Sequence, residues 1–132
     1  IIEDQMKKKI LYIEDIPANV ELVQQILDYR PNIELISSAN ALDGIKVAQE
    51  NLPDLILMDI HLPGMDGLEA FQRLQGISET EGIPVIALTA DAMTIDIKKA
   101  IDLGFHSYIT KPIDVGKFIT TIDSVIPTDE HD

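Results

Sequence analysis

Short apolar runs alternate with longer amphipathic stretches along this chain, and this alternation limits its fold more than any other feature. The runs are rich in β-branched and aliphatic residues, which is typical of strands. They are Lys9–Glu14, Ile33–Ser37, Leu55–Asp59, Val85–Thr89 and Ser107–Lys111. Strict alternation of strands and helices predicts a parallel sheet covered by helices on both faces, so the expected fold class is α/β, doubly wound, with five strands and five helices.

The stretches between the runs carry apolar residues at helical spacing. Asn40 and Asp114 stand where helix N-caps are expected, and Gly104 stands where a helix is expected to end. The runs Leu55–Asp59 and Val85–Thr89 are nearly continuous in apolar residues, which predicts central strands of the sheet.

Length and charge narrow the class of protein. The chain has 132 residues with a formal net charge of −13, which disfavours binding to nucleic acid or to anionic lipid, so we expect no nucleic-acid partner and no direct membrane contact. The length predicts one domain over residues 1–132, with a core at about residues 8–126. Cysteine is absent, which excludes disulfides and thiolate metal sites and favours a cytoplasmic location.

Charged and hydroxyl side chains stand at the ends of four of these runs. The first run ends at Glu14 and Asp15, the third at Asp59, the fourth at Thr89 and the fifth at Lys111. Each residue alone has an ordinary explanation, because an aspartate after a strand is often a turn former or a helix cap. Ligands of open α/β sheets bind beyond the carboxyl ends of the strands, so the joint pattern predicts a functional site there.

The same residues carry a family resemblance that covers roughly Lys8 to Ile126. The chain resembles the receiver domain of response regulators from two-component and phosphorelay systems, most closely the receivers attached to hybrid sensor histidine kinases. The motifs are Glu14-Asp15 in ILYIEDIPAN, Asp59 in LMDIHLPGMDG, Thr89 in IALTADAM, and the segment Tyr108–Pro112 (YITKP). The resemblance implies a flavodoxin-like sheet with strand order 2-1-3-4-5, an order for which a receiver is a standard example.

The resemblance also implies a phosphoacceptor chemistry. Asp59 would take a phosphoryl group from a phosphohistidine on a histidine kinase or a histidine phosphotransfer protein. A Mg²⁺ ion would be held by Glu14, Asp15, Asp59 and the backbone carbonyl of His61, the hard oxygen ligands that Mg²⁺ prefers. Such a protein would be a signalling phosphoacceptor rather than an enzyme, catalysing only its own phosphorylation and dephosphorylation.

A conformational switch belongs to the same resemblance. Lys111 and the Thr89 hydroxyl would contact phosphoryl oxygens, and movement of Thr89 would let Tyr108 turn from exposed to buried. The change would alter a face made by the fourth helix, fifth strand and fifth helix, where a downstream protein or a domain of the same chain would bind. The resemblance further implies a cis peptide bond before Pro112.

His61 and Asp91 lie two residues after Asp59 and Thr89, at positions that vary in this family, and we expect them to tune the lifetime of the phosphate. Two alternatives stay open. A haloacid-dehalogenase-like phosphatase also uses a strand-end aspartate, but it expects a second aspartate where this chain has His61. A receiver-like interaction module that is never phosphorylated is the other.

Overall fold

The alternation of strands and helices is realised as a single five-stranded sheet. A computed structural model of the protein describes residues 7–90 and 97–127. The strands lie in the order β2-β1-β3-β4-β5 and pair in parallel throughout. They are β1 (Lys8–Ile13), β2 (Ile33–Ser38), β3 (Leu55–Asp59), β4 (Val85–Thr89) and β5 (Ser107–Thr110). The predicted fold class and strand order are both confirmed.

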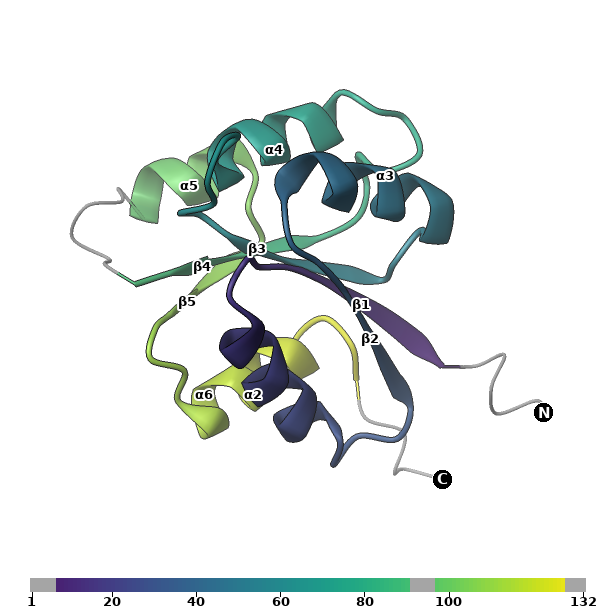
Figure 1. The fold of residues 1–132 in the computed structure, drawn as a ribbon, viewed down its shortest axis with the longest axis vertical. Coiled ribbons are helices and arrows are strands. Elements are labelled where there is room, and N and C mark those ends of the chain that lie inside the picture. The colour runs from purple at the N-terminus through teal and green to yellow at the C-terminus, as the bar shows by residue number, and fades with distance from the viewer. Residues whose placement is uncertain (1–6, 91–96, 128–132) are drawn as a thin grey trace.

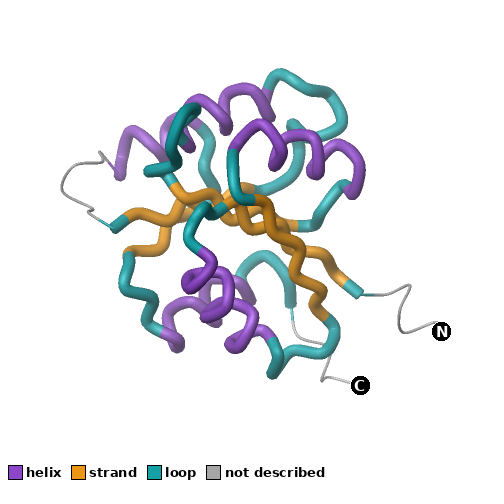
Figure 2. The backbone as a smooth tube through the Cα atoms, viewed as in Figure 1, coloured by secondary structure: helices purple, strands orange, loops and turns teal. Residues whose placement is uncertain are grey.

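Helices cover both faces of this sheet, as Figures 1 and 2 show. On one face lie α3 (Ala41–Asn51), α4 (Gly67–Gln75) and α5 (Ile97–Leu103), and on the other lie α2 (Pro17–Leu27) and α6 (Val115–Asp123). Each face has its own buried apolar cluster, because alternate side chains of a strand point to opposite sides. All residues of β3 and β4 are buried, which agrees with their predicted central positions.

The local signals at the helix ends explain where the elements begin and stop. The side chains of Asn40 and Asp114 cap α3 and α6 by accepting hydrogen bonds from backbone N–H groups, as predicted. Asp66 caps α4 in the same way, a cap that the sequence analysis did not identify. Gly104 follows α5 with φ of +122°, a backbone conformation that favours glycine and ends the helix.

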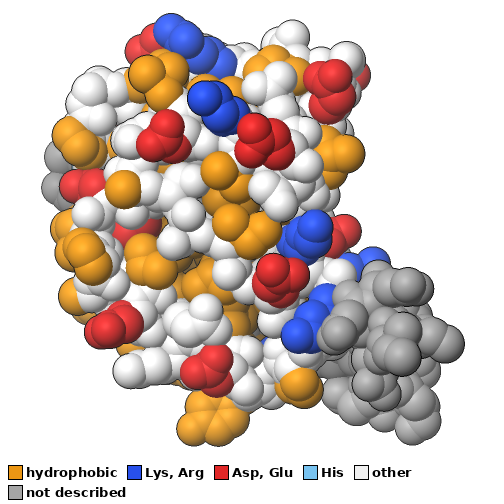
Figure 3. Space-filling view, turned by 45° about the vertical axis from the view of Figure 1, so that its right-hand side comes forward, with side chains coloured by type: hydrophobic (Ala, Val, Ile, Leu, Met, Phe, Trp, Pro, Cys, Tyr) orange, Lys and Arg blue, Asp and Glu red, His pale blue; other side chains and the backbone are white. Residues whose placement is uncertain are grey.

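Charged and apolar side chains are mixed on the surface. In the view of Figure 3, acidic and basic side chains are interspersed with hydrophobic ones. Within residues 7–90 and 97–127, none of the helices combines the length and apolarity required to cross a bilayer.

Candidate functional site

Parallel pairing of β1 with β3 brings three carboxylates together at the carboxyl end of the sheet. Glu14 and Asp15 follow β1 directly, and Asp59 is the last residue of β3. One carboxylate oxygen from each of the three lies within 4.8 Å of the others. These are the three acids that the sequence placed at the strand ends, and the structure joins them into one cluster.

Glu14 is held from three directions although its side chain is fully buried. Its Oε1 atom accepts hydrogen bonds from the Lys111 ammonium at 2.7 Å and from the Tyr12 hydroxyl at 2.9 Å. Its Oε2 atom accepts one from the backbone N–H of Ile16 at 3.2 Å. A buried carboxylate needs such partners, and with all three in place Glu14 has a fixed orientation.

Asp59 and Asp15 differ in how they are held. Asp59 is 4% exposed, and its Oδ1 atom accepts a hydrogen bond from the backbone N–H of His61 at 3.0 Å. Lys111 Nζ lies 3.4 Å from the other oxygen of Asp59, so one ammonium bridges two carboxylates. Asp15 is not the cap of the following helix, because that position belongs to Ile16 and no side chain caps it. The ordinary explanation of Asp15 as a helix cap is therefore wrong.

Burial and charge change the protonation of the two innermost acids in opposite directions. Burial raises the pKa of Asp59, and the neighbouring Glu14 charge adds to this, against the His61 N–H and Lys111, which lower it. Burial also acts to raise the pKa of Glu14, but hydrogen bonds from Lys111 and Tyr12 outweigh it and leave that pKa lowered. The site therefore favours the ionised form of Glu14 and disfavours the ionised form of Asp59.

The backbone at the start of α4 lies very close to the backbone of Asp59 and Ile60. The first residue of α4 is Gly67, whose N–H donates to the Ile60 carbonyl at 3.0 Å. A Cβ atom at Gly67 would lie 2.5 Å from the carbonyl oxygen of Asp59 and 2.8 Å from Ile60 Cα. Because both neighbours are backbone atoms, only glycine lets the helix begin this close to the end of β3.

The remaining predicted residues surround this cluster at different depths. Thr89 is fully buried at the end of β4, the strand between β3 and β5. Tyr108 is 40% exposed on β5, and the peptide bond between Lys111 and Pro112 is cis. The sequence had placed Lys111 at the end of the last strand, but β5 ends at Thr110 and Lys111 lies just beyond it. Asp91 lies outside the described residues.

Tyr12 is the contact that the sequence analysis missed. Its position inside an apolar run marks it only as a strand residue, yet its hydroxyl reaches Glu14. The signal that could have found it is the two-residue spacing, because Tyr12 and Glu14 project to the same side of an extended chain.

Comparison with known proteins decides the family of this site. The family model for the response regulator receiver domain matches residues 10–123. The chain belongs to the response regulator receiver family. It is 40% identical over 121 residues to the polar-differentiation response regulator DivK of Brucella anthropi, covering 92% of this chain and 98% of that protein. DivK of Brucella ovis is also 40% identical over 121 residues, with the same coverage.

Solved receiver structures agree with this fold. The receiver domain of the sensor histidine kinase PA1611 of Pseudomonas aeruginosa, which has a magnesium ion coordinated in its active site cleft, superposes with a TM-score of 0.82 at 26% identity. That match covers 92% of this chain and 99% of the other. The chemotaxis protein CheY4 of Vibrio cholerae has a TM-score of 0.82 at 21% identity, covering 90% of this chain and 98% of its own. Receivers of this family are signalling proteins.

Proposed function

We propose that Asp59 is the phosphoacceptor of this receiver and takes its phosphoryl group from a phosphohistidine on a histidine kinase or a histidine phosphotransfer protein. The observation that carries the proposal is the position of Asp59, buried at the carboxyl end of a central strand between two further acids and one ammonium. A carboxylate can act as a covalent nucleophile and form an acyl phosphate.

The residues fit a bound Mg²⁺ ion. Three carboxylates within 4.8 Å of one another supply the hard oxygen donors that Mg²⁺ selects, and Lys111 forms ion pairs with two of them, Glu14 and Asp59. Two like charges about 4 Å apart repel by about 4 kcal/mol at an effective dielectric constant of 20, so a cation is needed. Glu14, Asp15, Asp59 and the His61 carbonyl would hold the ion, which supplies neutralisation of phosphoryl charge.

The chain's own residues then orient the reaction. An Asp59 oxygen forms the new O–P bond as the P–N bond to the donor histidine breaks, and the electron pair of that bond returns to the imidazole. The His61 N–H fixes the second Asp59 oxygen, while Lys111 and the Thr89 hydroxyl donate to phosphoryl oxygens. Positioning and charge account for most of the rate in such transfers.

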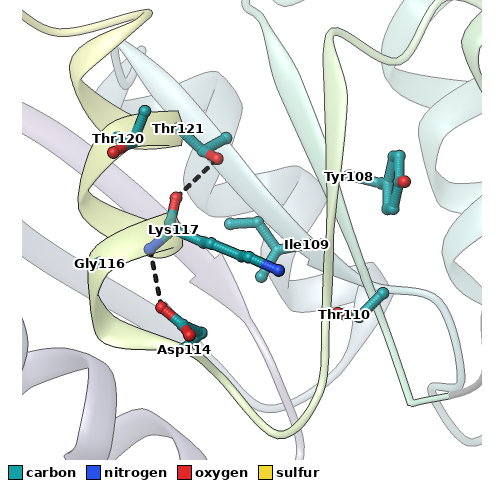
Figure 4. A pocket seen from close by; sticks show the side chains of 8 residues that line it. All are labelled: Tyr108, Ile109, Thr110, Asp114, Gly116, Lys117, Thr120 and Thr121. Atoms are coloured by element: carbon teal, nitrogen blue, oxygen red, sulfur yellow. Dashed lines mark hydrogen bonds between the residues drawn. The ribbon is translucent and has the colours of Figure 1, made fainter.

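In this proposal, phosphorylation of Asp59 changes the conformation of the face formed by α5, β5 and α6. Figure 4 shows a groove between β5 and α6, lined by Tyr108 and Ile109 of β5 and by Lys117 of α6 among other residues. Inward movement of Thr89 would let the exposed Tyr108 ring turn toward the protein interior. The face would then bind a downstream protein or another domain of the same polypeptide.

His61 and Asp91 are proposed to tune how long the phosphate persists. His61 is an exposed residue whose backbone N–H contacts Asp59, so its side chain is open to solvent close to the phosphoacceptor in sequence. An unchanged dephosphorylation rate in both His61→Ala and Asp91→Ala would remove this part of the proposal.

Neither alternative gains support. The family match is to receivers and not to phosphatases, and His61 occupies the place where a haloacid-dehalogenase-like enzyme expects an aspartate. A receiver that is never phosphorylated remains the outcome to be tested. A cytoplasmic location and a single receiver domain over residues 1–132 stay predictions.

Intact-mass spectrometry tests the phosphoacceptor. Wild-type protein and Asp59→Asn are incubated with Mg²⁺ and a small acyl phosphate. We expect the wild type to gain the mass of one phosphoryl group and Asp59→Asn to gain none. An adduct of equal yield in both proteins would assign the phosphate to another residue, and no adduct in either would favour the unphosphorylated module.

Calorimetry tests the metal site separately. Binding to the folded state alone stabilises it, by about 2.7 kcal/mol when the free ion is at 100 times its dissociation constant. Mg²⁺ should therefore raise the melting temperature by several degrees relative to protein in chelator. Coincident scans would count against the site.

A further inference from the structure

Tyr12 places a polar group in the apolar interior directly below the carboxylate cluster. The residue is fully buried near the carboxyl end of β1, where it lies opposite Ser37 of β2 and Leu57 of β3. Its ring belongs to the apolar cluster on the side of α2 and α6. A phenylalanine would fill this position without a hydroxyl to satisfy, so the hydroxyl needs an explanation beyond packing.

The hydroxyl shares a single oxygen atom with Lys111. Tyr12 donates to Glu14 Oε1 at 2.9 Å, and Lys111 Nζ donates to the same atom at 2.7 Å. A carboxylate oxygen accepts along two lone-pair directions, so the hydroxyl occupies one and leaves the other for the ammonium. From that side, Nζ also lies 3.4 Å from Asp59 Oδ2.

We propose that Tyr12 is a positioning residue, whose hydroxyl confines Lys111 to the side of Glu14 from which the ammonium reaches Asp59. This inference rests on the proposed function for its consequence, because Lys111 is the cation that would meet the phosphoryl group. Tyr12 touches neither reacting atom and acts only through Glu14.

The charge of its acceptor makes the hydroxyl suited to this role. Donation to an ionised acceptor is stronger than donation to a neutral one, so the hydroxyl competes effectively for the oxygen it shares with Lys111. Without it, Glu14 would hold the ammonium more tightly and in a different place.

Nuclear magnetic resonance of the metal-free protein tests the position of Lys111 directly. In Tyr12→Phe, which keeps the ring, we expect the Lys111 side-chain signals to shift. Tyr29→Phe is the matched control, because Tyr29 is exposed on the surface. In a Glu14→Ala background, Tyr12→Phe should leave the Lys111 signals in place, because the oxygen that both groups contact is absent. Unchanged signals in the single variant, or equal shifts in both backgrounds, would overturn the proposal.

Phosphorylation kinetics supply a second measurement. With a small acyl phosphate and saturating Mg²⁺, Tyr12→Phe should lower the rate constant by about three- to tenfold, because one hydrogen bond to a charged group is altered. The Mg²⁺ concentration for half-maximal rate should stay within about twofold, since the carboxylates remain. A rate equal to that of the wild type would contradict the proposal. If the wild type takes up no phosphoryl group, the proposed function fails, while the Lys111 signals still decide the role of Tyr12.

Discussion

The carboxyl ends of β1 and β3 and the edge of the sheet at β5 are neighbouring regions of opposite character. At β1 and β3, Glu14 and Asp59 are buried; Glu14 accepts three hydrogen bonds, and Asp59 accepts one and pairs with Lys111. At β5, Tyr108 is exposed and a groove opens toward α6. The centre therefore holds buried charges, whereas the edge presents accessible surface. Mutations at the carboxylate site should therefore change phosphorylation, whereas mutations at the β5 edge should change partner binding.

Loss of Lys111 should have the largest effect. Lys111→Ala leaves two buried carboxylates without their shared cation, and removing one member of a buried pair costs about 3–5 kcal/mol. Lys117→Ala is the matched control, because Lys117 is exposed in the groove at the edge and should change stability by less than about 0.5 kcal/mol. Urea unfolding in chelator measures both. Equal losses of stability in Lys111→Ala and Lys117→Ala would contradict the distinction between the carboxylate site and the edge.

Replacing Gly67 by alanine should destabilise the fold next to Asp59 through a steric clash, without changing any charge. The added Cβ atom would meet the Asp59 carbonyl at 2.5 Å, and overpacking of this kind costs about 1–3 kcal/mol. Gly82→Ala is the control, because a Cβ atom there has no neighbour within 4 Å. Thermal unfolding should separate the two variants. A Gly67→Ala protein with wild-type stability would show that α4 can move away from Asp59 freely.

The two innermost acids should respond to pH with opposite signs. The raised pKa of Asp59 means that the folded state holds the proton to higher pH than the unfolded state, so stability falls as pH rises through that window. Metal-free Asp59→Asn should then be more stable than the wild type at neutral pH, and the gain should vanish as pH falls below the ordinary aspartate pKa of about 3.9.

Glu14 supplies the matched comparison. Its pKa is lowered, so its charge stabilises the fold above the ordinary pKa of a glutamate, and this contribution is lost as pH falls through the lowered value. Glu14→Gln should therefore lose stability at neutral pH and approach the wild type in acid. The same sign for both variants would contradict the account of the site.

Truncation of Tyr108 should have the smallest effect on the chemistry. Tyr108 is 40% exposed and belongs to the edge region, so Tyr108→Ala should leave the phosphorylation rate with a small phosphodonor within about twofold of the wild type, as surface changes usually do. A large fall in rate, followed by intact mass over time, would show that the edge takes part in the chemistry.

Much of this organisation follows from local signals in the sequence. The bounds of β3 and β4 agree with those predicted, because continuous apolar runs are distinctive, and Asn40 and Asp114 cap helices as expected. The strand order came from the family resemblance, since alternation alone fixes the layers but not which strands are neighbours.

The detailed contacts of the site could not be predicted. Lys111 follows β5, which is separated from β3 by β4, and only the reach of its long side chain brings it to Glu14 and Asp59. The contact of the Tyr12 hydroxyl with Glu14 was also not predicted, because Tyr12 stands within an apolar run that indicates only a buried strand. Pattern fixes the face of a side chain, whereas its partner depends on the packing of several elements.

The most direct test of the central claim is the yield of phosphorylated protein with and without Mg²⁺. Wild-type protein is incubated with a small acyl phosphate in Mg²⁺ or in chelator, and fragment masses locate the added group. The account predicts a single phosphoryl group on Asp59 that requires Mg²⁺. A phosphoryl group on another residue, or equal labelling of Asp59 in chelator, would contradict it.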